Sequence, residues 1–444
     1  MAGDADQRLH WDDPTMRQTL TERILARACG RAEVKPGETV QVPVDLVFGQ
    51  DTTMPLAVIE FGRMGARRVF DPNRVAIVCD HFVPNATVQA AQQTKSLREF
   101  AAQQGIRYFF EAGRGGNHGI EHALLPEEGL IRPGMVIVGA DSHTTSYGAL
   151  GAFASGFGST DVAAAMALGE VWLRVPETML FVYQGELTRW VGAKDLILYT
   201  IGQIGVAGAL YRTMELVGPV IESLTVDERL TMCNMGVEAG AKNAIVPVDQ
   251  ETRRYLQSIE VDVTFSDDDT IYCSETDARY FSITEIDVSK IEPQVACPSS
   301  PDNVKGLSEV QGHELDAAFI GSCTNGRIGD LRSAATVLEG RRVSRNMRLI
   351  VIPATQRIYL QALREGLLEV FAEAGAAVST PTCGPCFGGH MGLLAAGERV
   401  ISTTNRNFVG RMGHPESEIF LSSPAVAAAS AVMGCIAHPD ELVE

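Results

Sequence analysis

The sequence of 444 residues has no uninterrupted apolar run of roughly 18 residues, the length that a transmembrane helix needs. Its first segment, MAGDADQRLHWDDPTMRQTL, is acidic and polar and has no apolar core of a secretory signal peptide. Excess positive charge is also missing, because 55 Asp and Glu outnumber 37 Lys and Arg and leave a formal net charge of −18. We therefore expect a cytoplasmic protein that binds neither membranes nor nucleic acids through a general basic surface.

A disulfide framework is not indicated either, because the nine cysteines are an odd number in a long chain without a secretory signal. Most are expected to be small buried side chains. Cys323, Cys383 and Cys386 differ, because they lie in segments rich in Gly, Pro, Ser and Thr. The Gly-rich segment GALGAFASGFGSTD lacks the Lys-Ser/Thr ending of a phosphate loop, so it is a weak indication of nucleotide binding.

Short β-branched segments alternate with longer segments rich in Ala, Leu, Glu and Arg, which is typical of α/β proteins with largely parallel, buried strands. Strands are predicted at Val75–Val78, Met135–Val138, Ala318–Ile320, Leu349–Ile352 and Val400–Ser402. Helices are predicted at Leu20–Ala28, from Asp161 to about Leu173, and at Pro424–Met433, with Ser423 as the N-cap of the last and Gly434 beyond its end.

The length of the chain and its 45% hydrophobic content allow two or three domains, each with its own core. After Arg174 a Pro-containing turn leads to a new apolar strand, MLFVYQGEL. From Asp287 to about Gly312 the chain is polar and rich in Pro and Ser, which predicts a linker. We therefore predict three domains, at 1–176, 177–288 and 289–444.

Polar side chains follow several of the predicted strands, where ligands bind in α/β sheets. They are Asp80 and His81; Asp141, Ser142 and His143; Ser322, Cys323, Thr324, Asn325 and Arg327; and Asn405, Arg406, Asn407 and Arg411. A large polar site is expected where these loops meet. Arg406 and Arg411 are candidates for carboxylate binding, because guanidinium groups bind carboxylates in a bidentate manner.

The segment CGPC at Cys383 and Cys386 has the letters of a thioredoxin dithiol, but the Gly pair that follows weakens the helix which that chemistry needs. A zinc site of Cys323, Cys383, Cys386 and His390 is chemically better. Three cysteines without an obvious fourth also suit an iron–sulfur cluster with one iron left open, which can act as a Lewis acid. The residues alone leave these alternatives open.

Six motifs then suggest a family: CDHFVP, GADSHTTSYGALGAF, CNMGVEAGA, GSCTNGR, CGPCFGGHMG and NRNFVGRMGHP. The residues of these motifs and their order along the chain resemble the aconitase superfamily of 4Fe-4S hydro-lyases, and the resemblance covers nearly the whole chain. Within it, the sequence is most similar to large subunits of the isopropylmalate dehydratase and homoaconitase type. The resemblance implies three α/β domains around a central cluster, with a swivel domain that is absent here and belongs to a separate small subunit.

The resemblance also implies roles for individual residues. Cys323, Cys383 and Cys386 would bind three irons of the cluster. Carboxylate–imidazole pairs would be Asp80 with His81, His122 with Glu238, and Asp141 with His143; substrate or cluster contacts would come from Gln50, Ser142, Asn234, Arg406 and Arg411. His118 competes with His122, which we prefer for its spacing to LPEEGL. Because the family's Ser base and a further Arg reside on the swivel domain, this chain alone is expected to be inactive.

The implied reaction is dehydration of a hydroxy di- or tricarboxylic acid and rehydration at the neighbouring carbon. The first substrate expected is 2-isopropylmalate, converted to 3-isopropylmalate in leucine biosynthesis, with homoaconitate and 2,3-dimethylmalate as alternatives. A zinc-stabilised structural protein without catalytic activity is the alternative of a different class.

Overall fold

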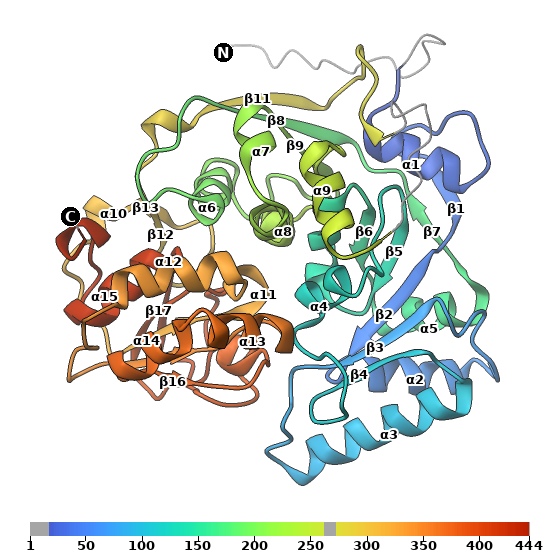
Figure 1. Ribbon diagram of the computed structural model, residues 1–444. Coiled ribbons are helices and arrows are strands. Elements are labelled where there is room, and N and C mark those ends of the chain that lie inside the picture. The colour runs from blue at the N-terminus through green and yellow to red at the C-terminus, as the bar shows by residue number, and fades with distance from the viewer. Residues whose placement is uncertain (1–16, 262–271, 444) are drawn as a thin grey trace.

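The computed structural model describes residues 17–261 and 272–443 (Figure 1). Residues 1–16, which carry most of the N-terminal segment that argued against a signal peptide, lie outside the described residues. Within these residues the strands form four sheets, of five, four, seven and two strands. None of the helices in the two described ranges combines the length and apolar character of a membrane span.

The first large sheet has five parallel strands in the order β4-β3-β2-β5-β6. Its strands are β2 (Leu46–Gln50), β3 (Val75–Cys79), β4 (Tyr108–Glu111), β5 (Val136–Gly139) and β6 (Phe153–Gly156). The helices of this region are α2 (Met54–Arg63), α3 (Val88–Gln104), α4 (Glu121–Glu127), α5 (Ser159–Leu168) and the 3-10 helix η1 (Ser142–Leu150). All residues of β3 and β5 are buried, as apolar runs in a parallel sheet predict, so these two predicted strands are confirmed.

The helix predicted at Leu20–Ala28 is confirmed as α1 (Leu20–Ala28), whereas the predicted end of the next helix is wrong. Helix α5 stops at Leu168, because Gly169 adopts a left-handed φ of 76°. The following residues form β7 (Glu170–Arg174), which pairs antiparallel with β1 (Thr39–Pro43) in the two-stranded sheet. In β7 buried Val171 and Leu173 alternate with exposed residues, and this period of two marks a strand.

The second large sheet has four parallel strands in the order β10-β9-β8-β11. They are β8 (Thr178–Gln184), β9 (Thr213–Val217), β10 (Asn243–Ile245) and β11 (Ser282–Asp287). The helical segments are α6 (Ala193–Ile204), α7 (Pro219–Ser223), α8 (Val226–Met235), η2 (Gly236–Ala239) and α9 (Gln250–Ser258). Strand β8 confirms the apolar strand predicted after Arg174.

The third sheet has seven strands in the order β13-β12-β18-β17-β14-β15-β16. They are β12 (Gln294–Ala296), β13 (Val304–Gly306), β14 (Ala317–Ile320), β15 (Arg348–Val351), β16 (Ala377–Val378), β17 (Arg399–Ser402) and β18 (Glu418–Leu421). The helical segments are η4 (Val288–Lys290), α10 (Leu307–Val310), α11 (Ser322–Asn325), α12 (Ile328–Leu338), α13 (Gln356–Arg364), α14 (Leu367–Ala374), η5 (Gly384–Phe387), α15 (Pro424–Met433) and η6 (Pro439–Glu441). The three strands and the last helix predicted here are confirmed, although Ser423 caps α15 without a side-chain hydrogen bond.

The linker predicted from Asp287 to about Gly312 is wrong. This segment supplies β12 and β13, which pair antiparallel with each other at one end of the third sheet. Val295 and Leu307 are fully buried, so this segment contributes to the hydrophobic core despite its Pro- and Ser-rich composition. Its prolines fall between the strands, as expected for a residue that cannot donate to a ladder.

The two predicted domain boundaries fall between sheets, but the core is continuous across them. One buried apolar cluster contains Phe48, Phe181 and Phe319, which come from the three large sheets. Figure 1 shows the orange to red C-terminal elements on one side and the blue to cyan elements on the other, with α4 and α11 between them. The boundaries at 176 and 288 therefore stay predictions.

Candidate active site

The polar residues predicted from the sequence meet where strands of the first and third sheets end. Asp80 directly follows β3, and Ser322 begins α11 one residue beyond the end of β14. Two bonds to the Asp80 carbonyl join the regions: the Cys383 amide donates at 3.0 Å and the Thr382 hydroxyl at 2.7 Å. Asn234 at the end of α8 then adds the second region to the site.

The residues Cys323, Cys383 and Cys386 are 6%, 5% and 5% exposed. The Ser322 hydroxyl lies 3.7 Å from the sulfur of Cys323 and 3.5 Å from that of Cys386. Burial and the neighbouring Cys386 raise the pKa of Cys323 to about 12. Burial, the Asp80 carboxylate and the other two thiols hold the pKa of Cys383 well above its usual range. Without a bound cation the thiols of Cys323 and Cys383 therefore keep their protons.

The spacing of the donor atoms distinguishes a cluster from a single zinc ion. Tetrahedral zinc with Zn–S bonds of about 2.3 Å requires sulfurs about 3.8 Å apart. Within the described ranges, the sets of three possible ligands whose donor atoms all lie within 4.8 Å of one another are Asp80, His81 and Cys383, and His122, Asp141 and His143. The three cysteines are not such a set, so at least two of their sulfurs are farther apart than 4.8 Å, which is too far for one tetrahedral zinc ion and leaves room for a larger group.

The thioredoxin interpretation is also disfavoured by the local structure. Cys383 and Cys386 are free thiols at a four-residue 3-10 helix, η5, where no long helix dipole lowers a pKa. The three buried thiols therefore fit a 4Fe-4S cluster in which each of them binds one iron and the fourth iron has no thiolate ligand.

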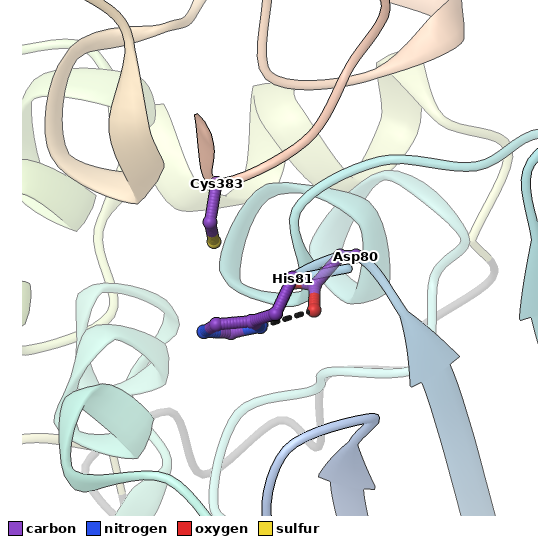
Figure 2. A group of neighbouring side chains, drawn as sticks. All are labelled: Asp80, His81 and Cys383. Carbon is purple, nitrogen blue, oxygen red and sulfur yellow. Dashed lines mark hydrogen bonds and ion pairs between the residues drawn. The ribbon is translucent and has the colours of Figure 1, made fainter. Parts of the chain in front are cut away.

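Next to Cys383 lies a tightly bonded acid–imidazole pair (Figure 2). Nδ1 of His81 is 2.6 Å from the Asp80 carboxylate, and the Cys383 sulfur points toward the imidazole ring. Asp51 fixes the backbone here, because its carboxylate accepts from the amide of His81 at 2.9 Å. Burial lowers the pKa of His81, but the charge of Asp80 outweighs it and raises the pKa to about 9. The pair is thus an imidazolium held by a carboxylate.

The remaining predicted pairs are connected differently from the prediction. His122 does not pair with Glu238: its Nε2 lies 3.0 Å from Asp141, and Glu238 instead lies 2.9 Å from Nε2 of His143. Nδ1 of His143 is 3.3 Å from Asp141, as predicted. Arg406 completes the chain through Nε, which donates to Glu238 at 2.8 Å. The prediction failed because motif order does not encode which of two facing imidazoles a carboxylate reaches.

These contacts fix the protonation of the two acids. Burial raises the pKa of Asp141, but hydrogen bonds from His122 and His143 outweigh it and hold the pKa well below its usual range. Burial likewise opposes ionisation of Glu238, yet the bond to His143 and the charge of Arg406 lower its pKa. Burial lowers the pKa of His122. Both carboxylates are therefore anionic.

The predicted contact residues surround this network. Asn234 donates to Ser146 at 2.9 Å and to the sulfur of Cys323 at 3.2 Å. The Gln50 amide lies 3.5 Å from Asp141. Ser142 lines a pocket of about 290 Å³, and Nε of Arg411 is buried without a hydrogen-bond partner among the described residues.

Two residues expected in the polar site were given no individual role, and a third was missed. Asn405 donates to the sulfur of Cys323 at 3.3 Å, and the Ser322 hydroxyl contacts two thiols. The third residue is Glu121. Glu121 is fully buried, its oxygens accept no hydrogen bond within the described residues, and burial with Asp80 nearby holds its pKa well above the usual range. His118 stays outside the network, in the loop before α4, which supports the choice of His122.

Buried thiols, acid–imidazole pairs and an arginine whose Nε has no hydrogen-bond partner among the described residues thus lie in loops that follow parallel strands, an arrangement suited to an enzyme that binds a carboxylic acid. The sequence model of the aconitase family (aconitate hydratase) matches the chain over residues 22–314 and 305–434. The chain belongs to this family of hydro-lyases, and the predicted resemblance and fold class are confirmed.

Individual relatives are similar over nearly their whole length. The chain is 57% identical over 428 residues to 3-isopropylmalate dehydratase large subunit 1 of Pyrococcus furiosus, covering 96% of this chain and 99% of that protein. It is also 57% identical over 429 residues to the 3-isopropylmalate dehydratase large subunit of Moorella thermoacetica, covering 97% and 100%. Among solved structures, aconitase X of Thermococcus kodakaraensis in its holo-form matches with a TM-score of 0.46 and 12% identity over 83% of this chain and 84% of that one.

Proposed function

We propose that the chain is the large, catalytic subunit of a 3-isopropylmalate dehydratase, which converts 2-isopropylmalate to 3-isopropylmalate by dehydration and rehydration. The observation that carries the proposal is the arrangement of three buried thiols beside the His81–Asp80 pair. The relatives named above support the choice of substrate. Leucine biosynthesis in the cytoplasm is the corresponding pathway and location.

Cys323, Cys383 and Cys386 would hold the 4Fe-4S cluster. When bound, an iron without a thiolate ligand supplies Lewis acidity to the substrate hydroxyl. Asn234 and Asn405 donate amide hydrogens to the sulfur of Cys323. Such donors stabilise a thiolate and orient it toward its metal.

The leaving hydroxyl needs a proton, and His81 is suited to donate it. Its Nδ1 faces Asp80, while its Nε2 makes no hydrogen bond within the described part of the chain. With a pKa of about 9, the imidazole is protonated at neutral pH. His122 and His143 instead have both ring nitrogens in contact with site residues, so we assign them to positioning through Asp141 and Glu238.

The substrate carboxylates would be bound by Arg411, whose Nε is unpartnered in the described structure. Arg406 is bonded to Glu238 and would fix the acid network that faces the substrate. Gln50 and Ser142 would complete the binding site beside Asp141. Holding both carboxylates positions the two reacting carbons for elimination and re-addition.

A small subunit that carries the swivel domain, with its Ser base and a further Arg, is part of the proposal. The isolated chain is then expected to be inactive until that subunit is added. Homoaconitate and 2,3-dimethylmalate remain the alternative substrates, because the group that reads the substrate side chain would lie on the partner.

The test starts with iron, acid-labile sulfide and zinc content of anaerobically purified protein. We expect about three to four irons with matching sulfide and broad absorption near 400 nm. Activity with 2-isopropylmalate, homoaconitate and 2,3-dimethylmalate is then measured after addition of the small subunit. Zinc without sulfide would refute the proposal and favour a structural protein.

Cys383→Ser is the matching variant, with Cys297→Ser as control because Cys297 is also buried but lies outside the site. Cys383→Ser is expected to lose iron, sulfide and activity, while Cys297→Ser keeps them. Retention of the cluster in Cys383→Ser would overturn the ligand assignment.

A further inference from the structure

Lys194 on α6 is a buried cation that the proposed reaction does not use. It is 2% exposed, and its ammonium donates to the carbonyls of Thr403 at 2.9 Å and Thr404 at 2.6 Å. No carboxylate oxygen of the described residues lies within 4.0 Å of this nitrogen. A buried ammonium without a paired anion is costly, so a position without an electrostatic role would favour an apolar side chain.

The nearby carboxylic acids are engaged elsewhere. Asp195 accepts from the amides of Gly192 at 3.0 Å and Gln294 at 2.8 Å, and burial raises its pKa to about 7. Asp330 accepts from the side chain of Asn325 at 2.8 Å, and burial raises its pKa to about 6. Neither is therefore a dedicated counter-ion of Lys194.

The hydrogen bonds of Lys194 lead to the thiol site instead. The Thr403 carbonyl that it holds also accepts from the hydroxyl of Thr324, the residue after Cys323. The Thr404 carbonyl immediately precedes Asn405, whose amide contacts the sulfur of Cys323. Burial lowers the pKa of Lys194 to about 7, and the charges of Cys323, Asp330 and Cys386 oppose that shift, so negative charge at the thiol site favours the ammonium form.

We propose that Lys194 is the buried counter-charge and positioning residue of the thiol site. This inference rests on the proposed function. Three thiolates around a 4Fe-4S group with a core charge of +2 leave a net negative charge in a buried region. The ammonium offsets that charge and fixes the loop that presents Asn405 and Arg406. Because a nearby cation favours the addition of an electron, loss of Lys194 makes one-electron reduction of the group harder.

The test compares Lys194→Gln, Lys194→Met and Lys194→Arg in the whole chain. Gln keeps a donor for the two carbonyls but removes the charge, and Arg keeps the charge. The readout is the midpoint potential from a dithionite titration followed by electron paramagnetic resonance, together with iron retained after exposure to a chelator. We expect a more negative potential and faster iron loss for Gln and Met, and values nearer to wild type for Arg.

Lys242→Met is the matched control, because Lys242 is also partly buried and its ammonium donates to a carbonyl, that of Gly156 at 3.2 Å. Its potential is expected to equal that of wild type. If Lys194→Met does not fold, Lys194→Gln decides. A wild-type potential in Lys194→Gln overturns the inference, whereas a wild-type chain that binds no iron overturns the proposed function itself.

Discussion

Arg229 allows a direct test of how much a buried ion pair stabilises the helix that carries Asn234. It lies on α8, the helix that presents Asn234 to Cys323, and its side chain is fully buried. Its guanidinium makes two bonds to Asp249, at 2.7 and 2.6 Å, and Nε donates to the carbonyls of Ile221 and Leu224 at 3.1 Å. Arg229→Met removes all of these bonds and leaves buried acceptors without donors.

Breaking a buried ion pair costs about 3–5 kcal/mol. The Asp249 side chain keeps 28% exposure, so its own loss lies near the lower end, and the orphaned carbonyls add about 1 kcal/mol or more each. We therefore expect a loss of about 5 kcal/mol for Arg229→Met. Arg332→Met is the matched control: its bidentate pair with Glu365 is as short, but the side chains are 52% and 30% exposed, so the expected loss is below about 1 kcal/mol.

The assay is the melting temperature of both variants in the same metal-loaded state. At an unfolding entropy of about 2 cal/mol/K per residue, a chain that melts as one unit loses about 5–6 °C for Arg229→Met and about 1 °C or less for Arg332→Met. Equal shifts in the melting temperatures of the two variants would refute the reasoning, because burial would then not determine how much an ion pair contributes to the free energy of unfolding.

Two further predictions concern pH and the position of the site loop. Burial raises the pKa of Glu22 from 4.5 to about 8, so the folded state binds an extra proton between these values. The free energy of unfolding should therefore fall as pH rises through this window, by on the order of 5 kcal/mol, and Glu22→Gln should flatten that slope in denaturant titrations. A Cβ on Gly156 would meet the Asp141 carbonyl at 2.6 Å. Gly156→Ala should therefore lower kcat/KM on the order of 100-fold, whereas Gly116→Ala, with open space around it, should not. A pH-independent Glu22 effect or equal activity of the two alanine variants would contradict these expectations.

The sequence was most informative where local chemistry and tertiary structure agree. Helix α15 could be predicted because a Pro at its first position and Gly434 at its end act locally. The end of α5 was missed although Gly169 marks it, because the apolar residues of β7 continue the hydrophobic pattern two residues after the helix. The supposed linker was missed because strands as short as β12 and β13 carry too few residues to show a period.

The site shows the same division between local and long-range information. The contact of His81 with Asp80 joins neighbours in sequence, so a dipeptide after a strand was enough to indicate it. The bond of His143 to Glu238 spans 95 residues and depends on how α8 and η2 pack against η1. The sequence could identify these groups, but their pairing is a property of the packed structure.

Arg406 and Arg411 illustrate how that packing divides the work of residues that look equivalent in the sequence. Both follow β17 in one loop, and both were assigned to carboxylate binding on that basis. Nε of Arg406 donates a hydrogen bond to Glu238, which also contacts His143. The positive charge of Arg406 therefore helps to keep Glu238 anionic, and Glu238 in turn orients the imidazole of His143. Nε of Arg411 is buried and unpartnered within the described residues, and a buried donor of this kind is stabilised by an incoming anion. We infer that Arg411 binds the substrate carboxylate and that Arg406 acts through the acid–imidazole network.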